Sequence, residues 1–184
     1  MSVGSRRDPV LAFNFQVSLM DSGVSRAGAL ATVVLSNVGL TRVAGFSECS
    51  GLEGALDMHE HTAGGVNSGA LRFPTRFKWS NITLKRGLSV GPGDPMLWDW
   101  FNGFILGRGK RRDGVIVLQN ESHEPHTAWG FRRGLPVRYV GPPLNAMQSN
   151  VAIETMEIAH EGLYQIPGAS PLAKAARAIF DALT

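Results

Sequence analysis

Short apolar runs broken by glycine and proline recur along the whole chain, a pattern typical of a mainly β protein with many turns. The run LAFNFQVSLM, at residues 11–20, alternates most regularly. Phe13, Phe15, Val17 and Leu19 fall on one side of an extended chain, and polar side chains fall between them. This alternation predicts a strand in a sheet that has one buried face and one wet face.

The segments that follow predict further strands and loops. Residues 21–40 are expected to form a loop and then a short strand around Thr32–Leu35. Residues 42–65 predict two strands that break at Gly51, and the polar stretch Gly64–Ala70 is expected to protrude as a hairpin tip or loop. Later strands are predicted at 114–119, 127–133, 135–141 and 151–164.

The apolar phase of these strands switches at two points. Phe77 and Trp79 share one phase of the alternation, whereas Ile82 and Leu84 share the other. This switch predicts either a bulge or a strand covered on both faces, and a covered second face would point to a partner. A second switch, between Ile153 and Met156, predicts another bulge.

One amphipathic helix is clearly marked and is expected to lie on a sheet. Asp94 can serve as its N-cap, Pro95 suits its first position, and Gly107 can end it. Its apolar stripe consists of Leu97, Trp100, Phe101, Phe104 and Ile105. Ser170 and Pro171 begin a short C-terminal helix in the same way. The chain is therefore expected to be mainly β, with one flanking helix and one short terminal helix.

The composition fits one soluble domain. Of the 184 residues, 43% are hydrophobic and 18% are charged, which argues against disorder and allows a sizeable core. No apolar run is long enough for a membrane helix or a signal peptide, so we expect a protein made in the cytoplasm. The 18 basic and 15 acidic residues are too nearly balanced to indicate nucleic-acid binding.

Candidate catalytic and metal sites are weak. The GRGK sequence at 107–110 lacks the spacing and the hydroxyl of a phosphate-binding loop, so a charged turn is expected there. His59 and His61 would share one face of a strand, but a metal site would need a third ligand from elsewhere. Cys49, the only cysteine, has no neighbouring group that would activate its thiol. We therefore expect no enzyme activity, no cofactor and no metal.

Six short phrases follow one another over most of the chain, within residues 8–19 and 41–163: DPVLAFNFQVSL, VAGFSECSGLE, NITLKRGL, LWDWF, VRYVGPPLNA and VAIETMEIAHEGL. In this order and spacing they resemble the tail tube proteins of contractile phages and of phage-tail-like contractile injection systems. The resemblance covers residues 1–163 as one tube-like β domain, with an insertion at 21–40 and a tail at 164–184 that depart from the shared pattern.

The resemblance implies a β-sandwich or barrel-like protomer. Six protomers would form a ring that shares an inner β-barrel, and the rings would stack into a hollow tube inside a contractile sheath. The implied partners are further copies of the chain, the sheath protein, the baseplate and tube-terminating proteins, and an effector or DNA as cargo in the lumen. A closed ring would also remove the free sheet edges of each protomer.

In similar tube proteins, the loop between early strands reaches the neighbouring ring. That role carries over here to Glu53–Ala70, where the candidate contact residues are Glu53, Asp57, His59, His61 and Asn67. Trp98, on the flank of the helix stripe, and Arg108 and Arg111, in a basic turn, are candidates for subunit contacts. The alternative is a baseplate-proximal paralogue that initiates the tube, or an adaptor that binds a partner of the same particle.

Overall fold

The computed structural model describes residues 9–22, 45–62, 69–88 and 96–166, and these contain one helix and nine strands. The strand expected at 32–35, the helix cap at 94–95 and the terminal helix lie outside the described residues. All strand pairs are antiparallel. The described part of the chain is thus mainly β, as the sequence predicts.

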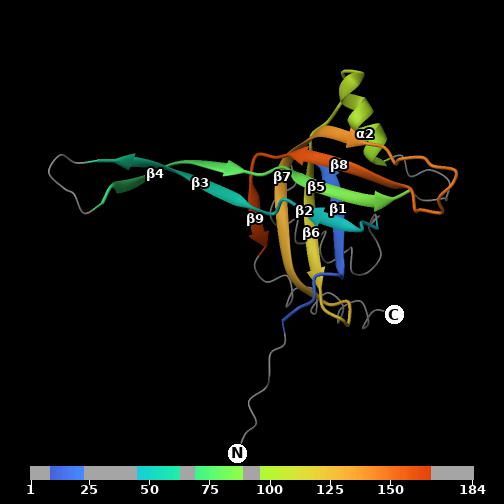
Figure 1. The fold of residues 1–184 in the computed structure, drawn as a ribbon, viewed down its shortest axis with the longest axis horizontal. Helices are drawn as coiled ribbons and strands as arrows, with labels where there is room; N and C mark the ends of the chain where they lie inside the picture. Colours follow the sequence, from blue (N-terminus) through green and yellow to red (C-terminus); the bar gives the residue numbers. More distant parts are fainter. Residues whose placement is uncertain (1–8, 23–44, 63–68, 89–95, 167–184) are drawn as a thin grey trace, which may run out of the picture.

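Two sheets share the long strand β7 (Pro125–Val140) and face each other (Figure 1). The first half of β7 lies between β6 (Arg112–Gln119) and β9 (Leu163–Ile166), and β1 (Phe15–Asp21) pairs with β6. We call this the first sheet. In the second sheet, the end of β7 pairs with β8 (Ile153–Ala159), followed by β5 (Ile82–Gly87) and β2 (Glu48–Ser50).

The strand β7 corrects one prediction, because the strands expected at 127–133 and 135–141 are one continuous strand. Arg133 adopts a positive φ of 50°, and Gly134 lies so close to the Phe131 ring that a Cβ would sit 2.7 Å from it. A register shift follows between Pro136 and Arg138. Gly134, which falls between the two predicted strands, therefore lets the strand bend from one sheet into the other.

Residues 151–164 were expected to form a single strand, but they form parts of two strands, β8 and β9. β8 and β9 are separated at His160–Gly162, and β9 runs three residues past the domain boundary expected at residue 163. The bulge predicted in β8 is also wrong, because its pairing with β5 runs without a shift from Ile82↔Ile158 to Gly87↔Ile153. Ile153 simply faces outward at the start of the strand.

The phase switch between Trp79 and Ile82 is likewise not a bulge. It separates β4 (Leu71–Trp79), which pairs with β3 (Gly54–His61), from β5 in the second sheet. The two predicted strands that break at Gly51 are confirmed as β2 and β3. Strands β3 and β4 form a hairpin that extends far from the body of the protein (Figure 1). We call this hairpin the arm.

The main core fills the space between the two sheets and is closed by α2 (Met96–Ile105). Its buried side chains are Val17, Ile82, Leu84, Leu97, Trp100, Ile116, Phe131, Met156 and Ile158. The Trp100 indole also donates a hydrogen bond of 2.8 Å to the Lys110 carbonyl. The predicted helix stripe is confirmed except at Ile105, which is 65% exposed because it lies at the free end of the helix.

The first sheet is buried on its second face as well. Val115, Val117, Ala128 and Ile166 form a separate cluster there, and Met20 packs against it. Ser18, expected on a wet face of β1, is only 5% exposed. The prediction of one wet face is therefore wrong for β1, because both faces of its sheet are covered.

Three polar side chains, those of Arg86, Tyr139 and Glu154, interact with one another close to α2. Arg86 of β5 and Glu154 of β8 are cross-strand neighbours, form an ion pair and are almost fully buried. The Tyr139 hydroxyl donates a 2.8 Å hydrogen bond to Glu154. The Tyr139 ring in turn contacts Trp98 and Phe101 of α2, with ring centres 5.1 and 6.2 Å away. These residues tie the second sheet to the helix.

Replacing Glu154 with alanine should lower the free energy of unfolding by about 3–5 kcal/mol, because it removes the carboxylate that faces a buried guanidinium. Glu157, on the outward face of the same strand, is the matched control. Its replacement by alanine should change the free energy of unfolding by less than about 1 kcal/mol. Urea unfolding of both variants measures the difference, and equal losses would contradict a structural role for the buried pair.

Burial and the hydrogen bond to Glu154 raise the pKa of Tyr139 to about 12, from an ordinary value of 10.0. The chain has two tyrosines, so a Tyr164→Phe variant reports Tyr139 alone. Its phenolate absorbance should titrate near the raised value when folded and near the ordinary value in urea. Because the folded state favours the neutral phenol, this contribution to stability is full below pH 10 and is lost as pH approaches 12.

Candidate assembly surfaces

The arm presents an apolar face to solvent. Phe77 lies opposite Leu56, and the Phe77 and Trp79 rings stack on this face with centres 5.5 Å apart. Met58 and Pro74 lie on the same face. The register shift between Leu56 and Met58 turns Phe73 and Leu71 to the other face, opposite His59 and His61. All of them are exposed, up to 60% for Phe77. An apolar surface of this kind marks an interaction site.

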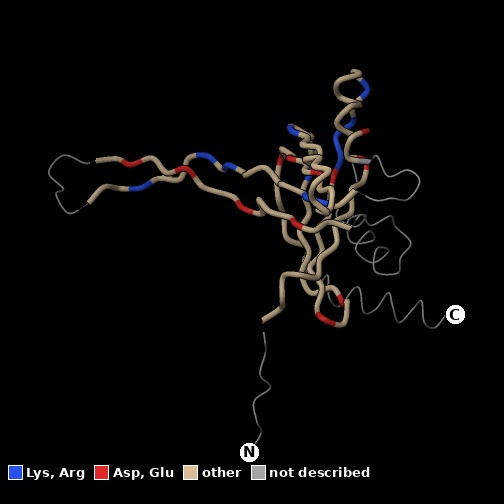
Figure 2. The backbone as a smooth tube through the Cα atoms, turned by 45° about the vertical axis from the view of Figure 1, so that its right-hand side comes forward, with Lys and Arg blue, Asp and Glu red and all other residues tan. Residues whose placement is uncertain are grey.

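Each face of the arm also carries one internal ion pair. Lys78 Nζ lies 2.7 Å from Asp57 Oδ2, and Arg72 Nε lies 2.9 Å from Glu60 Oε1. Figure 2 shows both signs of charge along the two strands. These exposed pairs contribute little to stability. The Asp57–Lys78 pair lies on the face opposite Phe77, whereas the Glu60–Arg72 pair lies on the Phe77 face, further from the body. Both faces of the arm therefore combine exposed apolar side chains with one ion pair.

The root of the arm is fixed to the body by short-range contacts. Ser80 Oγ donates a 2.7 Å hydrogen bond to Glu53 Oε1 across the two strands. The Trp79 ring lies over Gly54 and against His160, whose Nε2 donates to the Ser80 carbonyl at 3.1 Å. His160 also contacts the Phe131 ring of the main core. A line of rings therefore connects the arm to the core through His160.

Gly51 is the turning point between the second sheet and the arm. Its φ is +86°, and a Cβ at this position would lie 2.0 Å from the Asn81 carbonyl oxygen. Both the backbone conformation and the close approach require glycine. The sequence identified Gly51 as a strand break but gave no sign that it sets the direction of the arm.

The predicted contact residues of the loop segment are distributed along the arm. Glu53 lies at its root, Asp57 at a register shift, and His59 and His61 further out. The two histidines share one face, as predicted, and both are exposed. No group of three metal-ligating side chains occurs within the described ranges. Asn67 lies outside them.

The other three candidates lie on and after α2, away from the arm (Figure 1). Trp98 is 44% exposed and packs edge-on against Tyr139. Arg108 is exposed in the turn after the helix, where the predicted charged turn is confirmed. Arg111 donates to Glu161 at 2.6 Å, so its charge is already used within the subunit. Trp98 and Arg108 are the more available contact residues.

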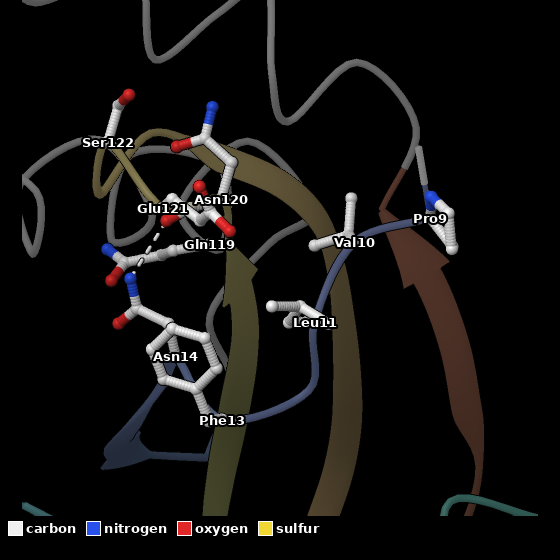
Figure 3. A pocket seen from close by; sticks show the side chains of 9 residues that line it. All are labelled: Pro9, Val10, Leu11, Phe13, Asn14, Gln119, Asn120, Glu121 and Ser122. Atoms are coloured by element: carbon white, nitrogen blue, oxygen red, sulfur yellow. Dashed lines mark hydrogen bonds between the residues drawn. The ribbon is translucent and has the colours of Figure 1, made fainter. Parts of the chain in front are cut away.

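An open pocket of about 310 Å³ lies between the N-terminal stretch and the β6–β7 turn. Figure 3 shows Pro9, Val10 and Leu11 on one side and the polar residues 119–122 on the other. Glu121 is its one ionisable carboxylate among these described lining residues. At Cys49, burial raises the pKa of the thiol to about 12, which keeps it protonated and unreactive.

No helix in the described parts of the chain could span a membrane.

Solved structures of contractile injection particles contain chains with the same fold. A chain in the structure of the anti-feeding prophage (AFP) baseplate is 23% identical, with a TM-score of 0.70 over 88% of this chain and 99% of that chain. A chain in the PVC sheath-tube complex in the extended state is 22% identical, with a TM-score of 0.67 over 89% and 93%. A chain in the AFP tube terminating cap is 21% identical, with a TM-score of 0.69 over 90% and 98%.

No curated protein sequence matches the chain. Residues 11–164, however, match the family of the T4-like virus tail tube protein gp19. The chain therefore belongs to this family of tail tube proteins. It is a structural subunit of the inner tube of a phage tail or phage-tail-like particle, and the resemblance seen in the sequence is confirmed.

Replacing Gly51 with alanine should destabilise the subunit by at least about 1–3 kcal/mol, since it forces a side chain into a left-handed conformation against the Asn81 carbonyl. Gly45→Ala is the matched control, because a Cβ there meets no atom within 4 Å. Urea unfolding compares the two variants. An unchanged midpoint for Gly51→Ala would contradict the role assigned to this turn.

Proposed function

We propose that six copies of this chain close into a ring, and that the rings stack as the repeated subunit of the inner tube of a contractile particle. The observation that carries this proposal is the arm, whose apolar face is exposed in the single chain. Such a face needs a cover, and stacked rings of the same chain provide one at every position. The role is structural, without catalysis.

The outer face of the second sheet suits the wall of a conduit. It presents mostly polar side chains from four strands: Glu48, Thr83, Lys85, Arg138, Thr155 and Glu157. Lys85 pairs with Glu48 at 2.8 Å, and Asn81 donates to Glu157 at 3.1 Å. Two acidic and two basic residues balance on this face. A wall of this kind would hold neither DNA nor a protein effector tightly, so cargo could slide along it.

We assign the arm segment and the residues on and after α2 to the contacts between rings and between neighbouring subunits. The segment Glu53–Ala70 would reach the neighbouring ring, with Glu53, Asp57, His59, His61 and Asn67 as contact residues. Trp98 and Arg108, with Arg111 beside them, would contact an adjacent subunit or the sheath. Similar chains occur in solved sheath-tube, baseplate and cap structures, which supports sheath, baseplate and terminating proteins as partners.

A position next to the baseplate is the alternative, since one similar chain comes from a baseplate structure. The number of copies of this chain per purified particle distinguishes the repeated tube subunit from a baseplate component. The repeated subunit should greatly outnumber the baseplate proteins. Equal numbers would assign the chain to the baseplate or to an adaptor.

Deletion of Gly64–Gly69 should abolish tube growth and leave the subunit folded, because the arm would no longer span the distance between rings. Electron microscopy over a range of concentrations measures growth, and circular dichroism measures folding. A matched control replaces the same residues with a glycine-serine linker of equal length. Normal tubes from the deletion variant would contradict an inter-ring role, and wild-type protein that never forms rings would contradict the tube proposal itself.

A further inference from the structure

The free end of α2 exposes apolar and basic side chains together. Ile105 is 65% exposed and Leu106 is 53% exposed. Arg108 and Lys110 follow in the next turn and are exposed as well, and within the described ranges neither forms an ion pair. We call these four residues the helix knob. Exposed apolar side chains bordered by charged ones mark sites of protein–protein contact.

The helix knob is held in one conformation by the way the helix ends. Gly107 has a φ of +69°, and its N–H donates to the Phe104 carbonyl at 3.1 Å. The Arg108 N–H donates to the Gly103 carbonyl at 2.7 Å. The left-handed glycine and these two bonds form a Schellman motif, a common end of helices. Because the backbone is already ordered, little of its entropy is lost when a partner covers the knob.

The open pocket beside the β6–β7 turn has the complementary composition, and we call it the turn pocket. Its N-terminal wall contains Leu11, which is 52% exposed, and Phe13, which is 71% exposed. Its polar wall carries Glu121, which is also exposed (Figure 3). No Lys or Arg occurs from residue 113 to residue 131, so strands β6 and β7 supply no positive counter-charge near this turn.

The two walls of the turn pocket are joined by hydrogen bonds. Asn14 Nδ2, from the N-terminal wall, donates to the Asn120 carbonyl at 2.9 Å (Figure 3). The Glu124 N–H donates to Asn120 Oδ1 at 2.8 Å, and the His123 N–H donates to the Asn120 carbonyl at 3.0 Å. The pocket is therefore formed before a partner arrives, as binding pockets usually are.

We propose that the turn pocket receives the helix knob of the neighbouring copy in the same ring; the inference rests on the proposed tube function. In this contact the apolar side chains of the knob lie against Leu11 and Phe13, and its basic side chains lie beside Glu121. Apolar and charged groups match at the same time, and the opposite charges favour this register over others. Every copy carries both surfaces, so in a closed ring each knob and each pocket is used once.

The knob and the pocket of one chain lie too far apart to meet. Strand β6 leads from the knob to the turn pocket, and its length, from Arg112 to Gln119, corresponds to about 25 Å of extended chain. The helix and the β6–β7 turn accordingly lie at opposite ends of the body (Figure 1). The arm leaves the body crosswise to β6 (Figure 1). A contact at the ends of β6 therefore joins copies side by side, whereas the arm points toward the next ring.

Cysteine cross-linking tests which surface the turn pocket meets. In a Cys49→Ser background, Leu11→Cys protein is mixed with Leu106→Cys protein, assembled into rings or rods and oxidised. Asp99→Cys is the matched control, because Asp99 is also exposed on α2 but lies in its first turn, away from the knob. The expected result is a disulfide between copies with Leu106→Cys and far less with Asp99→Cys.

Charge reversal tests whether the contact drives assembly. Glu121→Lys or Arg108→Glu alone should raise the concentration needed for rings by about tenfold or more, because like charges then face each other. Both changes in one chain should restore assembly toward wild type, since opposite charges meet again. Circular dichroism should be unchanged in all three variants, because both side chains are exposed. Glu48→Lys, a reversal on the outer face of the second sheet, is the control and should assemble far closer to wild type.

The outcomes separate this inference from the proposed function. Equal cross-linking with both helix positions, or a double reversal that assembles no better than the single variants, would overturn the knob contact and leave the tube function standing. Arg108→Glu protein that forms normal rings but no longer binds the sheath would likewise overturn it and assign the knob to the sheath. Wild-type protein that forms no rings, with or without other particle components, would overturn the tube function and this contact with it.

Discussion

The exposed apolar face of the arm is the constraint on which the rest of the structure depends. A two-stranded hairpin is marginally stable in water by itself, and this one has Leu56, Phe73 and Phe77 open to solvent. Its ion pairs are formed within the hairpin, so only its apolar side chains need a partner. The arm of a single chain therefore lacks a cover, and a partner that covers it would also raise the stability of the folded subunit.

An arm that must meet a partner at a fixed position has to leave the body in a fixed direction. The body fixes the direction of the arm through close backbone and ring contacts at its root. Gly51 turns the chain against the Asn81 carbonyl, and the Trp79 ring leads through His160 to Phe131 in the core. The buried Arg86–Glu154 pair gives the second sheet a unique register beside α2. Rigid packing in the body thus determines where the arm can reach.

Most of the element types could be predicted from the sequence, because alternation and helix periodicity are local signals. The errors occurred where tertiary structure decided the outcome. Gly134 falls between two predicted strands, but its missing Cβ leaves room for the Phe131 ring, and one strand continues between the two sheets. The polar side of β1 resembled a wet face, although Ser18 is buried. Family resemblance indicated the arm segment, but its sequence gave no sign of the register shift between Leu56 and Met58.

The two sheets differ in how many of their faces are buried, as a subunit of a hollow tube would require. The first sheet is covered on both faces, and the second keeps one polar face with balanced charge. In a hollow assembly, a protomer needs water on the lumen side and apolar contacts with its neighbours, and the arm exposes apolar side chains that could make such contacts. Strands β1 and β2 end the strand order in the described part of the chain. A closed ring would pair or cover such edges, which links solubility of the particle to completion of the ring.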